Sequence, residues 1–298
     1  MFYNHNFTLD VFVKEYDRLK SKGSLLTNFL LNFHDLQKKI LKKKECELIS
    51  YDNSMFLFIP SYTFRELYYF STSEECLQSD LSVLVKDNLN QGDNSGVKIR
   101  LVTKNENTEK KLSSLFESLG FEKKGKILRL QSGISKKKRK GISEYLDIMK
   151  EMVSSLPDNL KHVGYAEPGD EEKIQMLLLT EFDPVIDSVP ELDEIAEDIK
   201  KQFIIVVKDD LNNVIALRYF SVSLGVCSLI YEVTDKKYRK TCVFLQIYIF
   251  FTEEQKRANK EFKKIYGWRN ELKCNLLKFS KSMDESPDGT VISIFYKE

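Results

Sequence analysis

The order of apolar segments in residues 160–298 constrains the fold more than any other feature of the sequence. Short apolar runs of strand length alternate there with apolar residues at helical spacing. The polar run from Asp209 to Asn213 predicts a hairpin turn. Because hairpins give antiparallel pairs and helices give crossovers, we expect a mixed sheet. We predict strands at 163–166, 203–207, 214–222, 227–234, 262–268 and 291–296, and helices at 170–182, 190–201, 242–259 and 270–283.

Residues 1–131 repeat a similar order of elements. Matching elements of the two halves lie about 160 residues apart, a period far longer than that of solenoid repeats. The total of 298 residues also suits two compact domains. We therefore expect an α/β (α+β mixed sheet) fold with two similarly built domains in tandem. In this half we predict helices at 9–22, 25–43, from about 73, and 108–119, and strands at 46–50, 54–60, 63–71, 97–103 and 124–130.

A basic run separates the two halves. It comprises Lys136, Lys137, Lys138, Arg139 and Lys140, and it predicts an exposed connector. Apolar residues at helical spacing from Ile142 to Leu156 then predict a bridging helix. The predicted boundaries are residues 1–131 for the first domain, 132–159 for the linker and helix, and 160–298 for the second domain.

Composition excludes several classes of protein. With 42% hydrophobic and 31% charged residues, the chain can bury a core. Its apolar stretches reach about nine residues, whereas a membrane span needs about twenty. The first residues also lack the basic and apolar segments of a secretion signal, so we expect a cytoplasmic protein without a membrane partner.

Charge and cysteine usage narrow the possibilities further. Five cysteines without a CxxC motif and three scattered histidines predict reduced thiols and disfavour a metal site. A net charge of +1 with one basic junction disfavours a nucleic-acid partner. The sequence contains no phosphate-binding P-loop, dinucleotide-binding glycine motif or serine-hydrolase elbow. It leaves the oligomeric state open.

Two segments resemble motifs of one family. Leu115–Phe121 (LFESLGF) closes a predicted helix and is similar to the Leu-Tyr-x-x-x-Gly-Phe ending of modules in the GNAT superfamily of acyl-CoA-dependent acyltransferases. Val233–Val243 (VTDKKYRKTCV) runs from a strand into a helix and is similar to that family's pyrophosphate-binding segment, Gln/Arg-x-x-Gly-x-Gly/Ala. The element order of the second half matches the GNAT fold along nearly its full length. The first half matches the GNAT fold in its element order but has no recognisable cofactor segment. Gly120 would equally suit a helix C-cap.

The resemblance implies that acetyl-CoA or another acyl-CoA binds in the second domain. Backbone N–H groups at a helix start would hold the pyrophosphate of this co-substrate. Asn270 would be a further cofactor contact or the cap of the last helix. The segment departs from the family where Thr241 and Val243 replace glycines, since β-branched side chains would crowd the phosphates. The implied cofactor-binding residues are Val233, Tyr238, Arg239, Lys240, Thr241, Cys242, Val243 and Asn270.

The corresponding junction of the first half, Phe70–Glu75, carries no basic residue. Glu74 and Glu75 near the helix start would repel a pyrophosphate. We therefore expect no cofactor in the first domain.

The resemblance also implies catalytic roles. Amine acylation needs a base, for which Glu232 is the best-placed carboxylate, although it could equally be an ordinary strand glutamate. The family's acid is often the Tyr of its Leu-Tyr helix. Phe116 occupies that position in the first half, and Leu277 or Phe279 in the second, so this acid is missing. Nearby aromatic side chains are expected to pack rather than react. These are Tyr231, Tyr248, Tyr266 and Trp268.

Twelve acidic residues and one basic residue, Lys173, lie between Glu167 and Asp198. In the GNAT fold the corresponding helix pair borders the acceptor site. An acidic wall there would favour a cationic acceptor, a small-molecule or peptide amine. The same residues could equally form a solvated helix surface.

Three functions fit these observations. The first is an acyl-CoA-dependent N-acyltransferase that transfers acetyl from acetyl-CoA to an amine. The second is a non-catalytic GNAT-like binding or assembly module, which the missing glycines and tyrosine favour. The third is an aminoacyl-tRNA-dependent transferase of the Fem type, which also has tandem GNAT-like domains.

Overall fold

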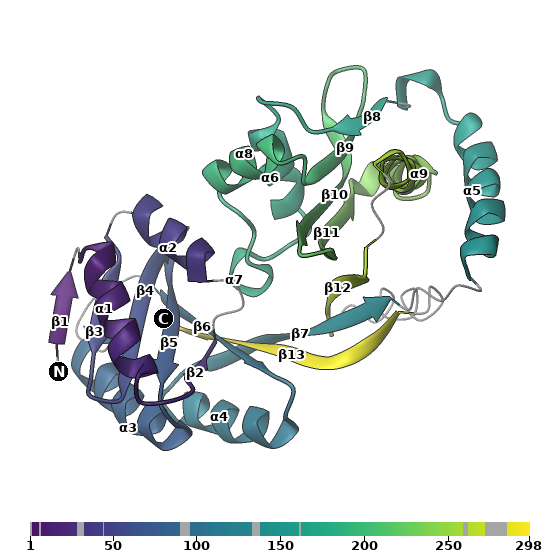
Figure 1. The fold of residues 1–298 in the computed structure, drawn as a ribbon. Coiled ribbons are helices and arrows are strands. Elements are labelled where there is room, and N and C mark those ends of the chain that lie inside the picture. The colour runs from purple at the N-terminus through teal and green to yellow at the C-terminus, as the bar shows by residue number, and fades with distance from the viewer. Residues whose placement is uncertain are drawn as a thin grey trace. The chain divides into compact units, whose positions relative to one another are not determined.

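The computed structural model describes residues 2–5, 7–28, 33–43, 45–89, 96–132, 138–160, 162–258, 262–271 and 285–298. The chain divides into two compact units. Unit 1 comprises Met1–Ile127 and Gly289–Glu298, and unit 2 comprises Leu128–Asp288. Each unit is built on a mixed sheet with helices on its faces, which confirms the predicted fold class (Figure 1).

Unit 1 has an antiparallel sheet that becomes parallel at one pair of strands. The order of the strands is β1-β3-β4-β5-β6-β13, in which only β5 and β6 run parallel. The elements are β1 (Phe2–His5), α1 (Leu9–Lys20), β2 (Leu26–Thr27), α2 (Phe33–Lys42), β3 (Glu47–Ser50), β4 (Ser54–Ser61), β5 (Phe64–Ser71), α3 (Glu74–Leu84), β6 (Gly96–Thr103), α4 (Glu106–Ser118) and the start of β7 (Glu122–Ser132).

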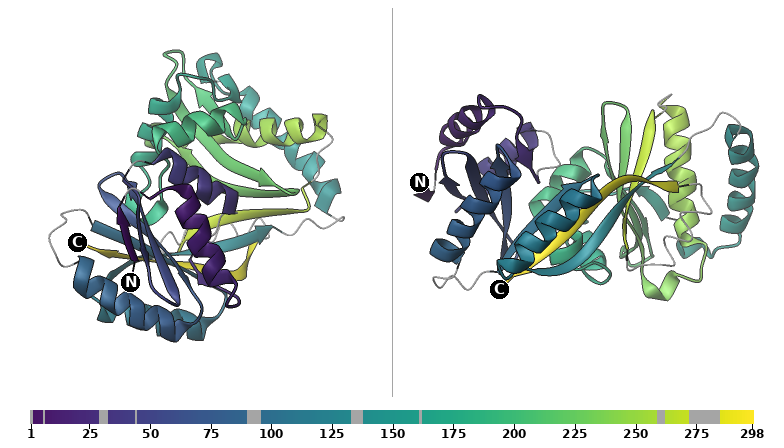
Figure 2. Two further views of the ribbon diagram at one scale, coloured as in Figure 1. Left: turned by 60° about the vertical axis from the view of Figure 1, so that its left-hand side comes forward. Right: turned by 90° about the horizontal axis from the view of Figure 1, so that it is seen from below.

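Both faces of the unit 1 sheet are buried because β4 is apolar on both sides. Leu57 and Ile59 pack under α1 and α2, whereas Phe56 and Phe58 pack against α3 and α4. Successive side chains of a strand point to opposite faces, so one apolar run serves two cores. The views in Figure 2 show the two helix pairs on opposite sides of these strands.

The motif Leu115–Phe121 forms a helix end with its own turn. The N–H of Phe121 donates to the carbonyl of Phe116, and Gly120 adopts a φ of 84°, which favours glycine. Phe121 is buried and its ring lies 6.3 Å from that of Phe116. This geometry matches the C-cap that the sequence suggests.

The last strand corrects the predicted domain boundary. The sequence analysis assigns residues 160–298 to the second domain, whereas Gly289–Glu298 belong to unit 1. β13 (Glu285–Lys297) pairs antiparallel with β6, from Val291↔Thr103 to Lys297↔Val97. Phe295 enters the core of unit 1, and this burial explains why the chain returns there.

Unit 2 repeats the arrangement. Its strand order is β12-β11-β10-β9-β8, in which only β11 and β12 run parallel. The structure thus confirms two similarly built domains in tandem. The elements are α5 (Lys138–Ser154), β8 (His162–Tyr165), α6 (Glu171–Leu179), α7 (Pro184–Asp187), α8 (Leu192–Lys200), β9 (Ile204–Lys208), β10 (Val214–Ser223), β11 (Val226–Thr234), α9 (Val243–Arg257) and β12 (Lys264–Asn270).

Helices α6 and α8 cover one face of the unit 2 sheet and α9 covers the other (Figure 1). On the first face, Ile174 and Ile195 pack against Tyr231 and Val233 of β11. On the second, Val243 and Ile247 pack among apolar residues of β9 and β10. β11 therefore contributes to both cores, with Cys227 and Leu229 on the α9 face and Tyr231 and Val233 on the face of α6 and α8.

Other differences from the predicted elements are local. The predicted helix 25–43 is wrong at its start, where residues 26–27 form β2 and the helix begins at Phe33. β1 and α7 were not predicted. The bridging helix begins at Lys138, within the basic run, whereas residues 133–137 and nearly all of the predicted helix 270–283 lie outside the described residues.

Candidate functional site

The strands β11 and β12 of unit 2 separate part-way along their length. Their parallel ladder runs from Val226↔Lys264 to Leu229↔Gly267, while the ladder between β10 and β11 continues to Ala216↔Thr234. The register with β10 shifts at Ile230, a bulge that bends a strand and increases its twist. We call residues 230–234 the β11 opening.

The predicted pyrophosphate segment lies directly after this opening. A short 3₁₀ helix, Lys236–Tyr238, follows β11, and its start is fixed because the Asp235 carboxylate accepts from the N–H of Lys237 at 2.8 Å. Helix α9 then begins at Val243, with Cys242, a free thiol, as its N-cap residue. The segment therefore leads from a diverging strand to a helix N-terminus, where the backbone favours anions.

The two residues in place of glycine have different surroundings. The Val243 side chain is fully buried in the core, and it therefore points away from the helix terminus. The Thr241 hydroxyl donates to the carbonyl of Tyr238 at 2.6 Å and accepts from the N–H of Val243 at 3.3 Å. Thr241 thus already satisfies one N–H at the start of α9.

The basic side chains of the segment are engaged to different degrees. Arg239 forms an ion pair with Glu181 and donates to the carbonyl of Thr234 at 3.2 Å. The Lys236 ammonium lies 3.8 Å from Glu181. Lys240 is exposed, and within the described part of the chain no carboxylate lies within 4.0 Å of its ammonium. The same holds for Lys237, so Lys237 and Lys240 are the described cations of this segment that a ligand reaches without breaking an ion pair.

Glu232, the predicted base, binds two arginines instead of facing solvent. One of its oxygens accepts from Arg218 at 3.0 and 2.7 Å, and the other accepts from Arg269 at 2.9 Å. Burial alone would raise the pKa of Glu232, but the two guanidinium groups outweigh it and hold the pKa below its ordinary value. A general base needs a pKa near the working pH, so this arrangement does not favour that role.

Arg218 connects this ion pair to helix α9. The guanidinium is 3% exposed and lies 5.0–5.6 Å from the ring centroids of Phe244, Tyr248 and Phe251. Cation–π attraction and the Glu232 carboxylate together offset the cost of burying this charge. The cluster thus fixes α9 against β10 and β11 beside the opening.

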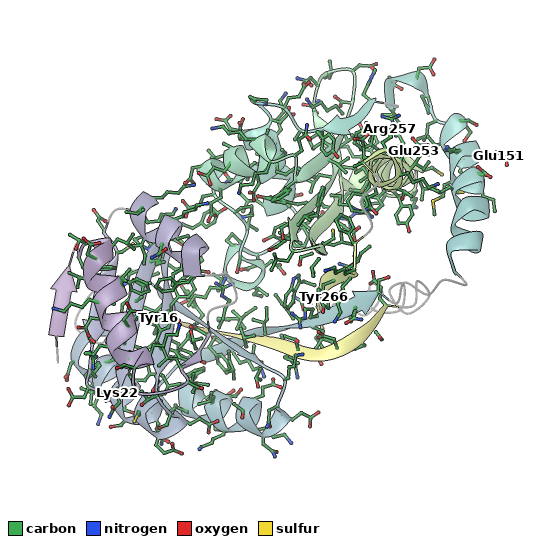
Figure 3. All side chains as sticks on the ribbon, viewed as in Figure 1. Tyr16, Lys22, Glu151, Glu253, Arg257 and Tyr266 are labelled. Atoms are coloured by element: carbon green, nitrogen blue, oxygen red, sulfur yellow. The ribbon has the colours of Figure 1, made fainter. Side chains whose placement is uncertain are left out.

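The other aromatic candidates pack or donate structural hydrogen bonds. The Tyr231 hydroxyl donates to the carbonyls of Asp187 and Ser188, each at 2.8 Å. The Arg129 guanidinium stacks over Tyr266 at 4.5 Å and lies 5.6 Å from the ring of Trp268. Figure 3 labels Tyr266 among the side chains. Asn270 ends β12. Leu277 and Phe279 lie outside the described residues.

The equivalent opening in unit 1 is occupied by the chain itself. The parallel ladder of β5 and β6 ends at Leu67↔Ile99, and β2 pairs with β5 directly beyond, at Thr27↔Phe70 and Leu26↔Ser71. Asn28 completes this edge, because its amide donates to the carbonyl of Leu67 at 2.8 Å and accepts from the N–H of Tyr69 at 2.9 Å.

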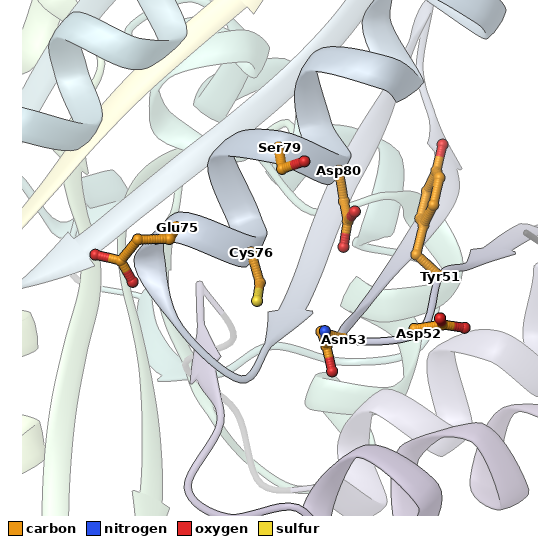
Figure 4. A pocket seen from close by; sticks show the side chains of 7 residues that line it. All are labelled: Tyr51, Asp52, Asn53, Glu75, Cys76, Ser79 and Asp80. Carbon is orange, nitrogen blue, oxygen red and sulfur yellow. The ribbon is translucent and has the colours of Figure 1, made fainter.

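The helix start in unit 1 is also unsuited to an anion. The Ser73 hydroxyl caps α3 by accepting from the N–H of Cys76 at 3.2 Å, and Glu74 and Glu75 occupy its first turn. A pocket of about 420 Å³ lies beside this helix (Figure 4). Its lining includes Asp52, Glu75 and Asp80 and no basic side chain, so it disfavours a phosphate group.

Comparison with solved structures identifies the fold. A tandem GNAT protein from the clavulanic acid biosynthesis pathway aligns over 100% of this chain and 98% of its own, with a TM-score of 0.60 and 8% identity. A GCN5-related N-acetyltransferase from Sphaerobacter thermophilus aligns over 99% and 95%, with a TM-score of 0.56 and 8% identity. The chain has a tandem GNAT fold. No protein-family model and no curated protein matches the sequence.

The described residues contain neither a metal-binding group nor a membrane-spanning helix. No group of three or more His, Cys, Asp or Glu side chains among the described residues could hold a metal ion. None of the helices that the structure describes is long and apolar enough to cross a membrane.

The sequence analysis did not identify four residues that lie at the β11 opening of unit 2 or at the equivalent opening of unit 1. Arg218 and Arg269 hold Glu232, Glu181 pairs with Arg239, and Asn28 fills the unit 1 opening. A charged residue inside the apolar strand 214–222 was a usable signal for Arg218. The others carry no local pattern that distinguishes them.

Proposed function

We propose that the protein is an N-acyltransferase that uses an acyl-CoA, such as acetyl-CoA, and binds this donor in unit 2. The β11 opening carries the proposal, because a strand edge that diverges from its neighbour leads directly into a helix N-terminus. The helix terminus and the Lys240 ammonium would attract the pyrophosphate of the donor. The solved structures with this fold include a protein named as a GCN5-related N-acetyltransferase.

An extended, amide-bearing ligand suits a diverging strand edge. Main-chain N–H and C=O groups of such an edge can pair with amides, as in the addition of a strand to a sheet. Unit 1 uses the equivalent edge to bind its own Asn28 and β2. Val233, Tyr238–Val243 and Asn270 remain the candidate contacts of the donor.

The acceptor is proposed to be an amine, either a small molecule or a peptide. The acidic residues of α6, α7 and α8 lie in the same unit as the β11 opening, and they favour a cation. Several of them also have structural partners. Asp170 binds Lys208 at 2.8 Å, and Asp198 accepts from the Tyr219 hydroxyl at 2.6 Å.

A second function has one observation in its favour. Thr241 bonds to the first N–H of α9 and Glu181 pairs with Arg239, so the chain's own groups already satisfy part of the segment. A non-catalytic binding module with the same fold would show these contacts. Acyl-CoA binding separates the two candidates.

Calorimetric titration with acetyl-CoA tests the proposal. We compare the unaltered protein with the double variant Arg239→Ala/Lys240→Ala. The control is Lys104→Ala/Lys110→Ala, which removes the same charge from exposed positions in unit 1. We expect saturable binding that the first variant loses and the control retains. Failure to bind at millimolar acetyl-CoA would instead support the binding module.

A further inference from the structure

The connection between α6 and α8 is attached to the β11 opening at several points. The Phe182 ring packs edge-on against the ring of Tyr231, with centroids 5.0 Å apart. The hydroxyl of the same tyrosine donates to the carbonyls of Asp187 and Ser188. These contacts hold the residue next to Phe182, Glu181, beside the start of the pyrophosphate segment.

The Glu181 carboxylate occupies a place that suits a bound anion. It pairs with the guanidinium of Arg239 and lies 3.8 Å from the ammonium of Lys236. Both cations belong to the turn between β11 and α9. The Glu181 side chain is 17% exposed, whereas that of Arg239 is 45% exposed. The carboxylate is thus held in place by its own segment, while the arginine remains accessible from solvent.

We propose that Glu181 is a built-in competitor for the anionic group of the ligand. A pyrophosphate that approaches the start of α9 would take over Arg239 and Lys236, and Glu181 would have to release both. The residue would therefore set the affinity of unit 2 for its ligand. This inference rests on the proposed function, since it concerns the same segment.

The expected gain in ligand affinity follows from the partial exposure of the Glu181–Arg239 ion pair. A partly exposed ion pair contributes about 0.2–1 kcal/mol, so its removal should tighten ligand binding about 1.4- to fivefold. Glu181→Gln keeps the size of the side chain, so the packing of Phe182 on Tyr231 is retained. Glu172→Gln is the matched control, because Glu172 is an exposed glutamate of α6, the helix that directly precedes Glu181.

The test is calorimetric titration of both variants and the unaltered protein with inorganic pyrophosphate and, separately, with acetyl-CoA. We expect Glu181→Gln to bind pyrophosphate about 1.4- to fivefold more tightly, and Glu172→Gln to bind it with unchanged affinity. The gain should disappear when Arg239→Ala is added, because both changes act on one pair. Equal affinities of Glu181→Gln and the unaltered protein would overturn the inference, as would absence of pyrophosphate binding in both.

The two titrants separate this inference from the proposed function. Tighter pyrophosphate binding in Glu181→Gln without any binding of acetyl-CoA would support the competitor and refute the acyltransferase. Binding of acetyl-CoA with equal affinity in both proteins would support the donor site and refute the competitor.

Discussion

Replacing Asn28 with alanine should destabilise unit 1 far more than the size of the side chain suggests. Asn28 is 1% exposed and supplies both a donor and an acceptor to the edge of β5. In Asn28→Ala the carbonyl of Leu67 and the N–H of Tyr69 would lose these partners inside the protein. Each buried polar group without a partner costs about 1–3 kcal/mol, so the free energy of unfolding should fall by about 2–6 kcal/mol.

Urea unfolding followed by far-ultraviolet circular dichroism measures this loss. Asn107→Ala is the control, because Asn107 lies exposed in helix α4 and its substitution should change stability by at most about 0.5 kcal/mol. Amide hydrogen exchange of Tyr69 should also become faster in Asn28→Ala, as its N–H loses protection. A stability of Asn28→Ala within about 0.5 kcal/mol of the unaltered protein would refute the idea that Asn28 closes the unit 1 opening.

Two further substitutions test the buried charges. Glu232→Gln should lower the free energy of unfolding by about 3 kcal/mol, because it leaves the buried Arg218 without its carboxylate partner and Arg269 with the more distant Glu285, 3.8 Å away. Lost turnover at unchanged stability in a denaturant titration would instead indicate a catalytic base. Burial lowers the pKa of Lys98 to about 8, although Glu66, 3.6 Å away, opposes the shift. The unfolded chain then binds more protons between pH 8 and about 10, so stability should rise with pH across this range. Lys98→Met should abolish that rise in thermal melts at pH 8 and 9.5, and an unchanged rise would assign it to another group.

The order of strands and helices was predictable because apolar periodicity dictates it. Strands such as 203–207 and 214–222 read as a hairpin from their turn residues alone, and the structure has them as β9 and β10. The tertiary pairing of short segments was not predictable. Residues 26–28 lie among the apolar residues from which a helix at 25–43 is predicted, yet they run along the edge of β5, whose main-chain groups need hydrogen-bond partners.

The candidate site was predictable in position but not in its contacts. A charged turn between a strand and a helix was enough to point to residues 236–243. The partners of these residues come from distant parts of the chain, as with Glu181 and Arg239. The role of Glu232 was unpredictable for the same reason. Only the fold brings Arg218 and Arg269 to its carboxylate, and these two arginines lower its pKa.

Hydrogen–deuterium exchange of the full chain, with and without saturating acetyl-CoA, tests the central claim most directly. The claim is that the donor binds at the β11 opening of unit 2 and not at the filled opening of unit 1. We predict slower exchange in peptides that cover residues 229–245 and unchanged exchange in peptides that cover residues 67–77. Protection of 67–77, or no protection of 229–245, would contradict it.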